Sequence, residues 1–282
     1  MSRQKLIYFL LVLLPITSCD GGSNSDDRSE SDTSQVRGHE EILKNTAKVL
    51  TLPTPMQIPA LLKNTNAVYD ASNLLPIVTS QKSYYKSGLL FGMYMLDLGY
   101  TSSFSHQQAS LNYFKACKQI GDDLGLGVKI TQGHVNRFNE NLNKPDSLGR
   151  IILDMYDLGH KVLIDQEKEG LGFLMVLGCY MEGLNIVLDQ AQDHDLILFV
   201  HLLNQQKNYG NNLKSVLNGY EIPLEIQQEV KDFNTVLNTL NKIDLPSVYE
   251  LKSGSKTIVG IKREDITLIK QSVSSFRKSI LI

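Results

Sequence analysis

The stretch from Ser80 to Ser103, SQKSYYKSGLLFGMYMLDLGYTSS, decides the fold class of this chain. Its large apolar side chains would lie on every side of a helix and would leave no clean polar face. A helix with an apolar surface all round belongs in the middle of a core. The segment from Leu171 to Gln190, LGFLMVLGCYMEGLNIVLDQ, has the same character. These two segments therefore predict two central helices around which the rest of the chain packs.

The remaining sequence predicts shorter or amphipathic helices, separated by proline and glycine. We expect them at 39–50, 60–65, 105–124, 131–142, 147–166, 195–218, 223–243 and 264–281. The only strand signal is at Ser247–Leu251 and Lys256–Ile261, which flank Gly254 and would pair as a small β-hairpin. The chain is therefore predicted to be an all-α multi-helix bundle with at most one small β-hairpin near the C-terminus. Its helical domain would span 39–282.

A short internal echo links the two apolar helices. Gly92-Met-Tyr-Met-Leu-Asp97 resembles Gly178-Cys-Tyr-Met-Glu182, and both helices carry further glycines. Glycine costs about 1 kcal/mol in a helix interior, so its repeated use predicts close approach of helix backbones. The echo is compatible with a duplicated helical hairpin, although two copies do not establish a solenoid.

Two acidic residues interrupt the apolar helices and form the candidate buried polar site. If the helices pack together, Asp97 and Glu182 would face one another near Tyr94, Tyr100 and Tyr180. Such a pair would serve as an acid/base couple or as an oxygen-rich cation site. The alternative, which is commoner in proteins, is structural: each carboxylate caps a helix end or accepts a tyrosine hydroxyl.

Two further sets of residues have metal-ligand character but do not predict a metal site. Asp157-x-x-His160, with Asp154 one turn earlier, matches one half of the ferritin-like helix motif, and the chain has no second copy. His194 and His201 are seven residues apart beside Asp193 and Asp195, and exposed polar residues at a helix start explain them equally well. We therefore expect no metal, and the absence of a P-loop or dinucleotide fingerprint predicts no cofactor.

The amino-acid composition argues against several classes of binding partner. The chain of 282 residues has a formal net charge of −2 with scattered Lys and Arg, which argues against nucleic acid. It has no Trp and only 7% aromatic residues, which argues against an aromatic sugar-binding platform. Cys117 and Cys179 both lie in apolar helical stretches, where free buried cysteines are expected rather than a disulfide.

The N-terminus has the organisation of a bacterial lipoprotein precursor. Arg3 and Lys5 precede an apolar run from Leu6 to Leu14, which is less than half the length of a membrane-spanning helix. Ile16-Thr17-Ser18-Cys19 then matches a lipobox, in which the cysteine thiol takes up a diacylglycerol before cleavage. We expect residues 1–18 to be a signal peptide and Cys19 to carry the lipid, such as palmitate. The alternative is an ordinary secretory peptide with an incidental cysteine.

The segment 19–38 is expected to be a disordered acidic tether, because it has no large apolar residue before Val36. Its acidic residues follow Cys19 closely, as in the surface-export signal of Bacteroidetes lipoproteins. Two alternatives remain open. The acidic segment would be a solvated spacer without a sorting role, or Asp20 directly after Cys19 would retain the protein at the inner membrane, as it does in enterobacterial lipoproteins.

A longer segment resembles uncharacterised helical lipoproteins of Bacteroidetes. It runs from Tyr84 to Gly125 and contains Leu96-Asp97-Leu98-Gly99-Tyr100-Thr101 and a helix closing in Asp123-Leu124-Gly125. The later Glu182-Gly183-Leu184 fits the same pattern, and the resemblance covers about residues 50–190. It implies an all-α fold and a location in the cell envelope, and it carries no activity with it.

The sequence therefore favours an envelope lipoprotein, anchored in the outer membrane on its periplasmic or surface face. Its domain would be a non-enzymatic binding or interaction module for an envelope protein or a small molecule. The alternative is an enzyme or a metal-binding helical protein that uses Asp97 and Glu182.

Overall fold

The computed structural model describes residues 54–63, 67–78, 82–127, 130–165, 168–190, 196–246 and 263–282. All of them lie in the second of the two units into which the chain divides, Ile42–Ile282. The expected signal peptide, tether, first helix and C-terminal β-hairpin lie outside the described residues. Within these ranges every regular element is a helix, which confirms the all-α prediction.

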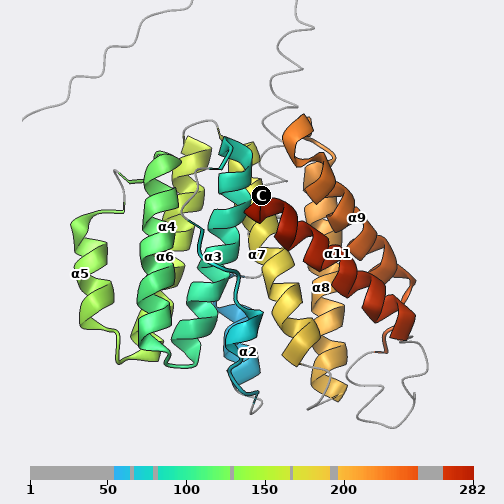
Figure 1. Cartoon of the computed structure of the whole chain (residues 1–282), viewed down its shortest axis with the longest axis horizontal. Helices are drawn as coiled ribbons and strands as arrows, with labels where there is room; N and C mark the ends of the chain where they lie inside the picture. Colours follow the sequence, from blue (N-terminus) through green and yellow to red (C-terminus); the bar gives the residue numbers. More distant parts are fainter. Residues whose placement is uncertain are drawn as a thin grey trace, which may run out of the picture. The chain divides into compact units, whose positions relative to one another are not determined.

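Figure 1 shows the helices in chain order. The α-helices are α2 (Gln57–Lys63), α3 (Tyr84–Ser103), α4 (Gln107–Asp123), α5 (Gln132–Glu140), α6 (Pro145–Asp165), α7 (Glu169–Gln190), α8 (Leu196–Leu217), α9 (Gln227–Lys242) and α11 (Arg263–Leu281). Two short 3₁₀ helices, η1 (Ala71–Asn73) and η2 (Leu224–Ile226), accompany them.

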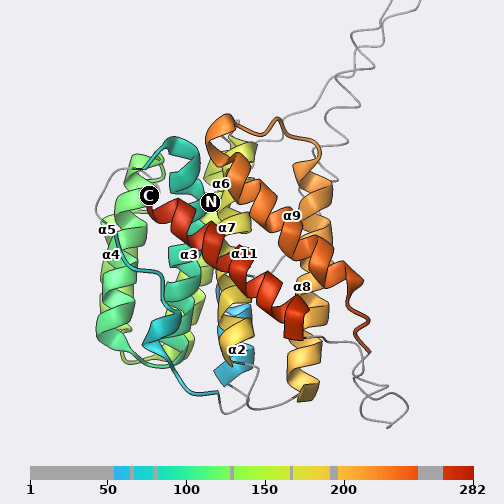
Figure 2. The ribbon, with the colours of Figure 1, turned by 45° about the vertical axis from the view of Figure 1, so that its right-hand side comes forward.

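Helices α3 and α7 lie side by side in the middle of the bundle, as Figures 1 and 2 show. Gly92 of α3 lies against the backbone carbonyl of Met175 in α7, and Gly178 of α7 lies against the carbonyl of Leu89 in α3. Each glycine thus meets the carbonyl three residues before the other glycine, so the contact is reciprocal. Gly88 lies beside Leu171, and Leu96 lies beside Gly183, so the two helices run parallel. The prediction of close backbone approach at the repeated glycines is confirmed.

Helix α7 is apolar because it is buried. Its segment Gly170–Asp189 is long and apolar enough to cross a membrane, yet 94% of the tested window is buried inside the protein. Packing in the core therefore accounts for its composition.

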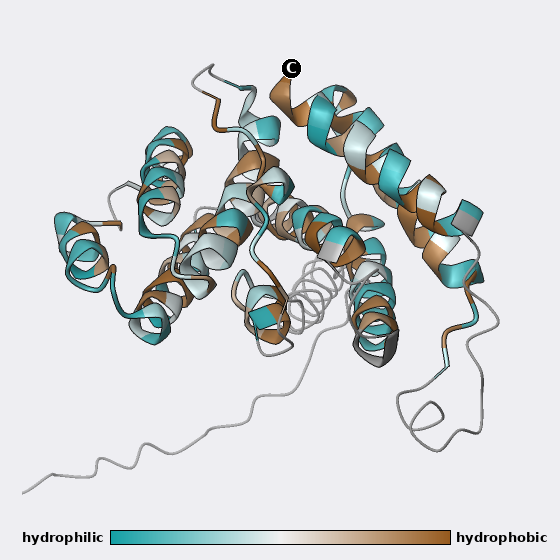
Figure 3. Ribbon diagram, turned by 60° about the horizontal axis from the view of Figure 1, so that its bottom comes forward, coloured by the Kyte–Doolittle hydropathy of each residue, from teal (hydrophilic) through white to brown (hydrophobic). Residues whose placement is uncertain are grey.

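The outer helices cover this central pair from two sides. Helices α4 and α6 pack on α3, with α5 on α6, whereas α8 and α11 pack on α7 and α9 packs on α8 and α11. Helix α11 crosses the bundle obliquely (Figure 2). Near the C-terminus in Figure 3, hydrophilic and hydrophobic turns alternate along α11, as expected for a helix with one buried face.

The helix ends show what the sequence predicted well and what it did not. Helix α4 ends at Asp123, and Gly125 follows in the left-handed region at φ 82°, as the glycines there predict. The start of this helix was predicted at 105, but α4 begins after His106, and Ser105 lies before the helix with φ 62°. Pro59 lies inside α2, where the first turn needs no amide hydrogen.

The segment 67–78, called the strap below, is extended on both sides of η1. Asp70 caps η1 by accepting a 2.8 Å hydrogen bond from the amide of Ser72. The strap lies over the bundle with Leu75 and Asn73 buried, so it is part of the core's wall.

Candidate functional site

The candidate site is a pair of carboxyl groups between the two central helices. Asp97 comes from α3 and Glu182 from α7, and both side chains have no exposed surface. The two carboxyl groups are close enough for each to influence the pKa of the other. The sequence-based expectation that these residues face one another is met, because α3 and α7 run parallel in close contact.

The strap supplies one partner of the pair. The Leu75 amide donates a 3.0 Å hydrogen bond to Oδ2 of Asp97. The second oxygen of Asp97, Oδ1, receives no hydrogen bond from any N–H group of the described residues. Because a buried oxygen without a donor is costly, the second oxygen is the one suited to carry a proton.

Helix α11 supplies the positive charge. Nε of Arg277 lies 3.0 Å from Oε2 of Glu182, and the guanidinium is 17% exposed at the edge of the core. The same guanidinium donates from Nη2 to the carbonyl of Asn73 at 2.8 Å, and the Asn185 amide donates to that carbonyl at 3.2 Å. Arg277 therefore ties the acid pair, the strap and the C-terminal helix together.

Burial controls the protonation of the pair. Loss of solvation, followed by the charge of Glu182, raises the pKa of Asp97 well above its ordinary range. Loss of solvation also raises the pKa of Glu182, to about 7, although the Arg277 guanidinium opposes this shift. Near neutral pH the favoured arrangement is a neutral Asp97 that donates to an ionised Glu182 beside Arg277.

The tyrosines expected near this pair bind the strap instead of the carboxylates. The Tyr94 hydroxyl donates to the carbonyl of Pro76 and accepts from the amide of Val78, both at 2.9 Å. The Tyr100 hydroxyl accepts from the amide of Asp70 at 2.9 Å.

Tyr180 lies apart from these groups. Its hydroxyl donates to the carbonyl of Gln206 in α8 at 3.1 Å, and its ring makes an edge contact with Phe233 of α9. The structure therefore brings together four of the five residues predicted for the site and places Tyr180 on the other side of α7.

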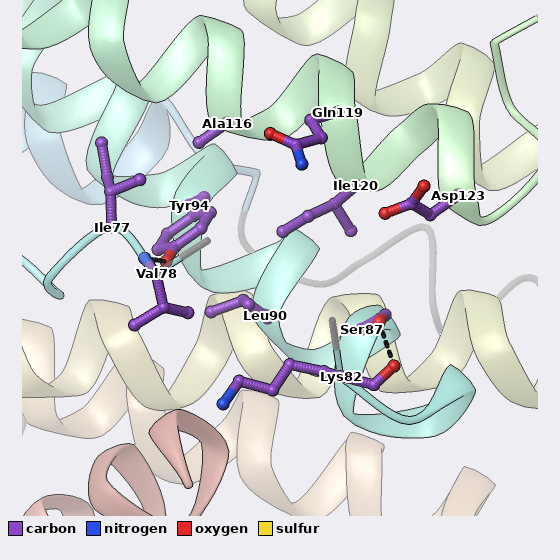
Figure 4. A pocket seen from close by; sticks show the side chains of 10 residues that line it. All are labelled: Ile77, Val78, Lys82, Ser87, Leu90, Tyr94, Ala116, Gln119, Ile120 and Asp123. Atoms are coloured by element: carbon purple, nitrogen blue, oxygen red, sulfur yellow. Dashed lines mark hydrogen bonds between the residues drawn. The ribbon is translucent and has the colours of Figure 1, made fainter. Parts of the chain in front are cut away.

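An open cavity of about 270 Å³ lies next to the strap (Figure 4). Tyr94 connects it to the site, since its ring lines the cavity while its hydroxyl binds the strap. Leu90, Ala116 and Ile120 provide apolar walls, and Asp123 lies at one end. Asp97 and Glu182 do not line this cavity.

The other candidates have structural partners. Asp154 pairs with Arg137 at 3.3 Å, and His160 is partly buried against Gly172. No cluster of three or more metal-ligating side chains occurs among the described residues. His201 contacts Gln205 at 3.0 Å, whereas His194 lies outside the described residues.

Cys117 and Cys179 are free and buried, as the apolar helices predicted. Burial raises the pKa of both thiols, that of Cys179 to about 12. Neither thiol has the lowered pKa of a reactive cysteine.

Sequence reasoning missed Arg277, Asn73 and Tyr113. The Tyr113 hydroxyl donates to the carbonyl of Leu75 at 2.6 Å. A usable signal exists only for Arg277, which follows Val273 by four residues on the apolar stripe of the last helix. Asn73 and Tyr113 have no comparable signal, because their partners are backbone groups of the strap.

Comparison of the chain with known protein families, with characterised proteins and with solved structures finds no match.

Proposed function

We propose that this chain is an envelope lipoprotein whose helical domain acts by binding rather than by catalysis. The observation that carries the binding role is the complete burial of Asp97 and Glu182. A catalytic acid/base pair must reach its substrate, and here the strap and Arg277 occupy that position. The pair is thus used to hold the fold together.

The cavity beside the strap is the place where such a domain would take a small ligand. Its volume of about 270 Å³ is close to the lower end of ligand pockets, which begin at about 300 Å³. Its lining combines apolar side chains with the polar side chains of Lys82, Gln119 and Asp123, which suits a compact molecule that has both polar and apolar groups. An envelope protein remains the other partner under this proposal.

The alternative function, an enzyme or a metal-binding protein that uses Asp97 and Glu182, finds less support. The Arg277 guanidinium occupies the position beside Glu182 where a cation would bind. Carboxyl accessibility tests this point directly. When the native protein is treated with a water-soluble carbodiimide and glycine ethyl ester, we expect exposed Asp154 to be modified and Asp97 and Glu182 to be spared. Modification of the buried pair in the native state would favour the alternative.

The anchor is carried by Ile16-Thr17-Ser18-Cys19 and the apolar run before it. Lipid chains contribute about 0.8 kcal/mol per buried methylene, so two or three chains hold a protein on a membrane very strongly. The acidic residues behind Cys19, together with the resemblance to Bacteroidetes lipoproteins, support the outer membrane as the location.

Metabolic labelling tests the anchor. Cells that express the full chain are grown with an alkyne analogue of palmitate, and the protein is then separated by detergent-free fractionation. We expect label and membrane association in the wild type and neither in Cys19→Ala. Cys117→Ala is the matched control, because it removes a buried thiol and leaves the lipobox unchanged. Equal labelling of wild type and Cys19→Ala would refute the anchor.

Protease treatment of intact cells tests the face of the membrane. A surface-exposed domain is degraded without lysis, whereas a periplasmic domain is degraded only after the outer membrane is opened. Full protection of the domain in intact cells would refute the surface-export interpretation of the acidic tether and leave the anchor itself in place.

A further inference from the structure

The buried carboxyl groups of Asp97 and Glu182 contact two distant parts of the chain, the strap and helix α11. We infer that one proton, bound between Asp97 and Glu182, is a structural ligand that locks the strap and helix α11 in place, and that losing it at higher pH releases both. This inference goes beyond the proposed binding role and does not depend on it.

The charges around the pair require this proton. Two carboxyl groups with no exposed surface face one guanidinium, Arg277. With both carboxyls ionised, the core would hold an uncompensated negative charge, and two acceptor oxygens would meet without a hydrogen between them. One proton makes the set neutral and turns the repulsive contact into a hydrogen bond.

The geometry also assigns the atom that carries the proton. Oδ2 of Asp97 already accepts from the Leu75 amide, as a carbonyl oxygen does in a neutral acid. Oδ1 of Asp97 receives no hydrogen bond from an N–H group, so it is free to act as the O–H donor. Glu182, which lies beside Arg277, is then the ionised acceptor.

The same atoms connect the proton to the strap and to α11. Asp97 binds the strap through the Leu75 amide. Glu182 holds Arg277 of α11, whose guanidinium in turn binds the strap at the Asn73 carbonyl. If Asp97 loses its proton, Asp97 and Glu182 are both negatively charged and repel each other, which weakens the contacts of Asp97 with the strap and of Glu182 with Arg277. Opening of the strap then exposes the ionised Asp97 to water, which solvates its charge.

The other groups that face the pair do not supply this titration between pH 5 and pH 9. Burial raises the pKa of the neighbouring phenols and thiols, and these groups therefore stay neutral: Tyr69 on the strap, Tyr94 and Tyr100 on α3, Tyr113 and Cys117 on α4, Tyr156 on α6, and Cys179 on α7. Asp70 is ionised, because hydrogen bonds from Ser72 lower its pKa. His106 stacks on Tyr69 of the strap with 3.5 Å between ring centroids, so the experiment includes a variant of this residue.

Linkage gives the size of the effect. The closed state holds the Asp97 proton up to its raised pKa, whereas the open state releases it near the ordinary pKa of an aspartate. Above pH 7, where Glu182 is ionised, and up to the raised pKa of Asp97, the equilibrium constant for opening rises about tenfold for each pH unit, because opening releases one proton.

Hydrogen exchange measures this opening directly. The reporters in the full chain are the Leu75 amide and the amides of α11, and each rate is divided by the intrinsic rate at that pH. In the wild type we expect protection of these amides to fall about tenfold per pH unit above pH 7, where Glu182 is ionised. Asp97→Asn should remove this pH dependence above pH 7, because an amide donates to Glu182 and accepts from Leu75 at every pH.

Two variants control for other acids and bases. Asp232→Asn changes a buried acid on α9 away from the strap, and His106→Phe keeps a ring stacked on Tyr69. Both should retain the wild-type slope at Leu75. The inference is overturned if the wild type shows no slope, or if Asp97→Asn keeps it.

A measurement on the unsubstituted chain covers the case in which Asp97→Asn does not fold. With carbon-13 in the aspartate side chains, the infrared carbonyl band of a protonated carboxyl should be present at pH 7. The band should disappear at higher pH together with Leu75 protection. Absence of a protonated aspartate at pH 7 would overturn the inference.

Discussion

Gly92→Ala tests the most tightly constrained contact of the fold. A Cβ at position 92 would overlap the Met175 carbonyl oxygen and lie 2.8 Å from its carbonyl carbon and 2.9 Å from the Cys179 amide nitrogen. These atoms belong to the backbone of α7, which cannot rotate away as a side chain does. The substitution must therefore push α3 and α7 apart along their contact.

The expected cost follows from two opposing effects. Overpacking a core costs about 1–3 kcal/mol when neighbours can adjust, and a backbone obstacle puts this site at the upper end, about 3 kcal/mol. Alanine in place of glycine returns about 1 kcal/mol through helix propensity. We expect Gly92→Ala to lower the free energy of unfolding by about 2 kcal/mol.

Gly159→Ala is the matched control in α6. The nearest atoms to its added Cβ are side-chain carbons of Leu126 and Phe91 at 3.6 and 3.7 Å, which is ordinary van der Waals contact. Only the helix propensity then changes, so this variant should gain up to about 1 kcal/mol. Urea denaturation of the purified protein, followed by circular dichroism, measures both variants.

The two glycines of the reciprocal contact should also be coupled. Once Gly92→Ala has separated the helices, Gly178→Ala costs less than it does alone, so the double variant should be less destabilised than the sum. If Gly92→Ala is as stable as the wild type or more stable, the close backbone contact between α3 and α7 is refuted.

Four further predictions follow from the site. Burial raises the pKa of Glu182 from 4.5 to about 7, so the folded state holds a proton that the unfolded state releases, and this group should lower the free energy of unfolding by about 3 kcal/mol as pH rises across that window. The raised pKa of Asp97 adds to this fall and continues it at higher pH, so a free energy of unfolding that rises with pH in denaturation curves would contradict both. Arg277→Met should lower the free energy of unfolding by about 3 kcal/mol at pH 8, because it leaves the ionised Glu182 buried without its partner. The loss should be smaller at pH 5, where Glu182 is protonated, and equal losses at both pH values would count against the ion pair. Tyr113→Phe should lower the free energy of unfolding by about 1–3 kcal/mol, because the buried carbonyl of Leu75 loses its hydrogen-bond donor. An unchanged denaturation midpoint would mean that this hydrogen bond does not contribute to stability. Cys117 and Cys179 should react with Ellman's reagent only after unfolding, and rapid reaction in native protein would contradict their burial.

The all-α fold and its two central helices could be predicted because a buried helix needs no polar face, and that property is visible in the spacing of residues along one segment. The repeated glycines predicted close contact between the helices, because glycine in a helix interior is unfavourable unless it allows close packing. Asp97 and Glu182 stood out because a carboxylate inside an apolar helix needs a partner. Their identity as candidates came from the sequence, and their partners did not.

Tertiary structure decided what surrounds the pair. Arg277 lies 95 residues after Glu182 in the chain, and only the crossing of α11 over α7 brings the two together. The strap meets Asp97, Tyr94 and Tyr100 through backbone amides and carbonyls, which every residue carries, so no residue type predicts these bonds. Tyr180 was expected beside the carboxylates and lies on the other side of α7, because the rotation of a helix about its axis is set by packing. Local sequence predicts the helices and the proposed lipobox at Cys19, whereas the buried carboxyl cluster forms only where α3, α7, α11 and the strap meet.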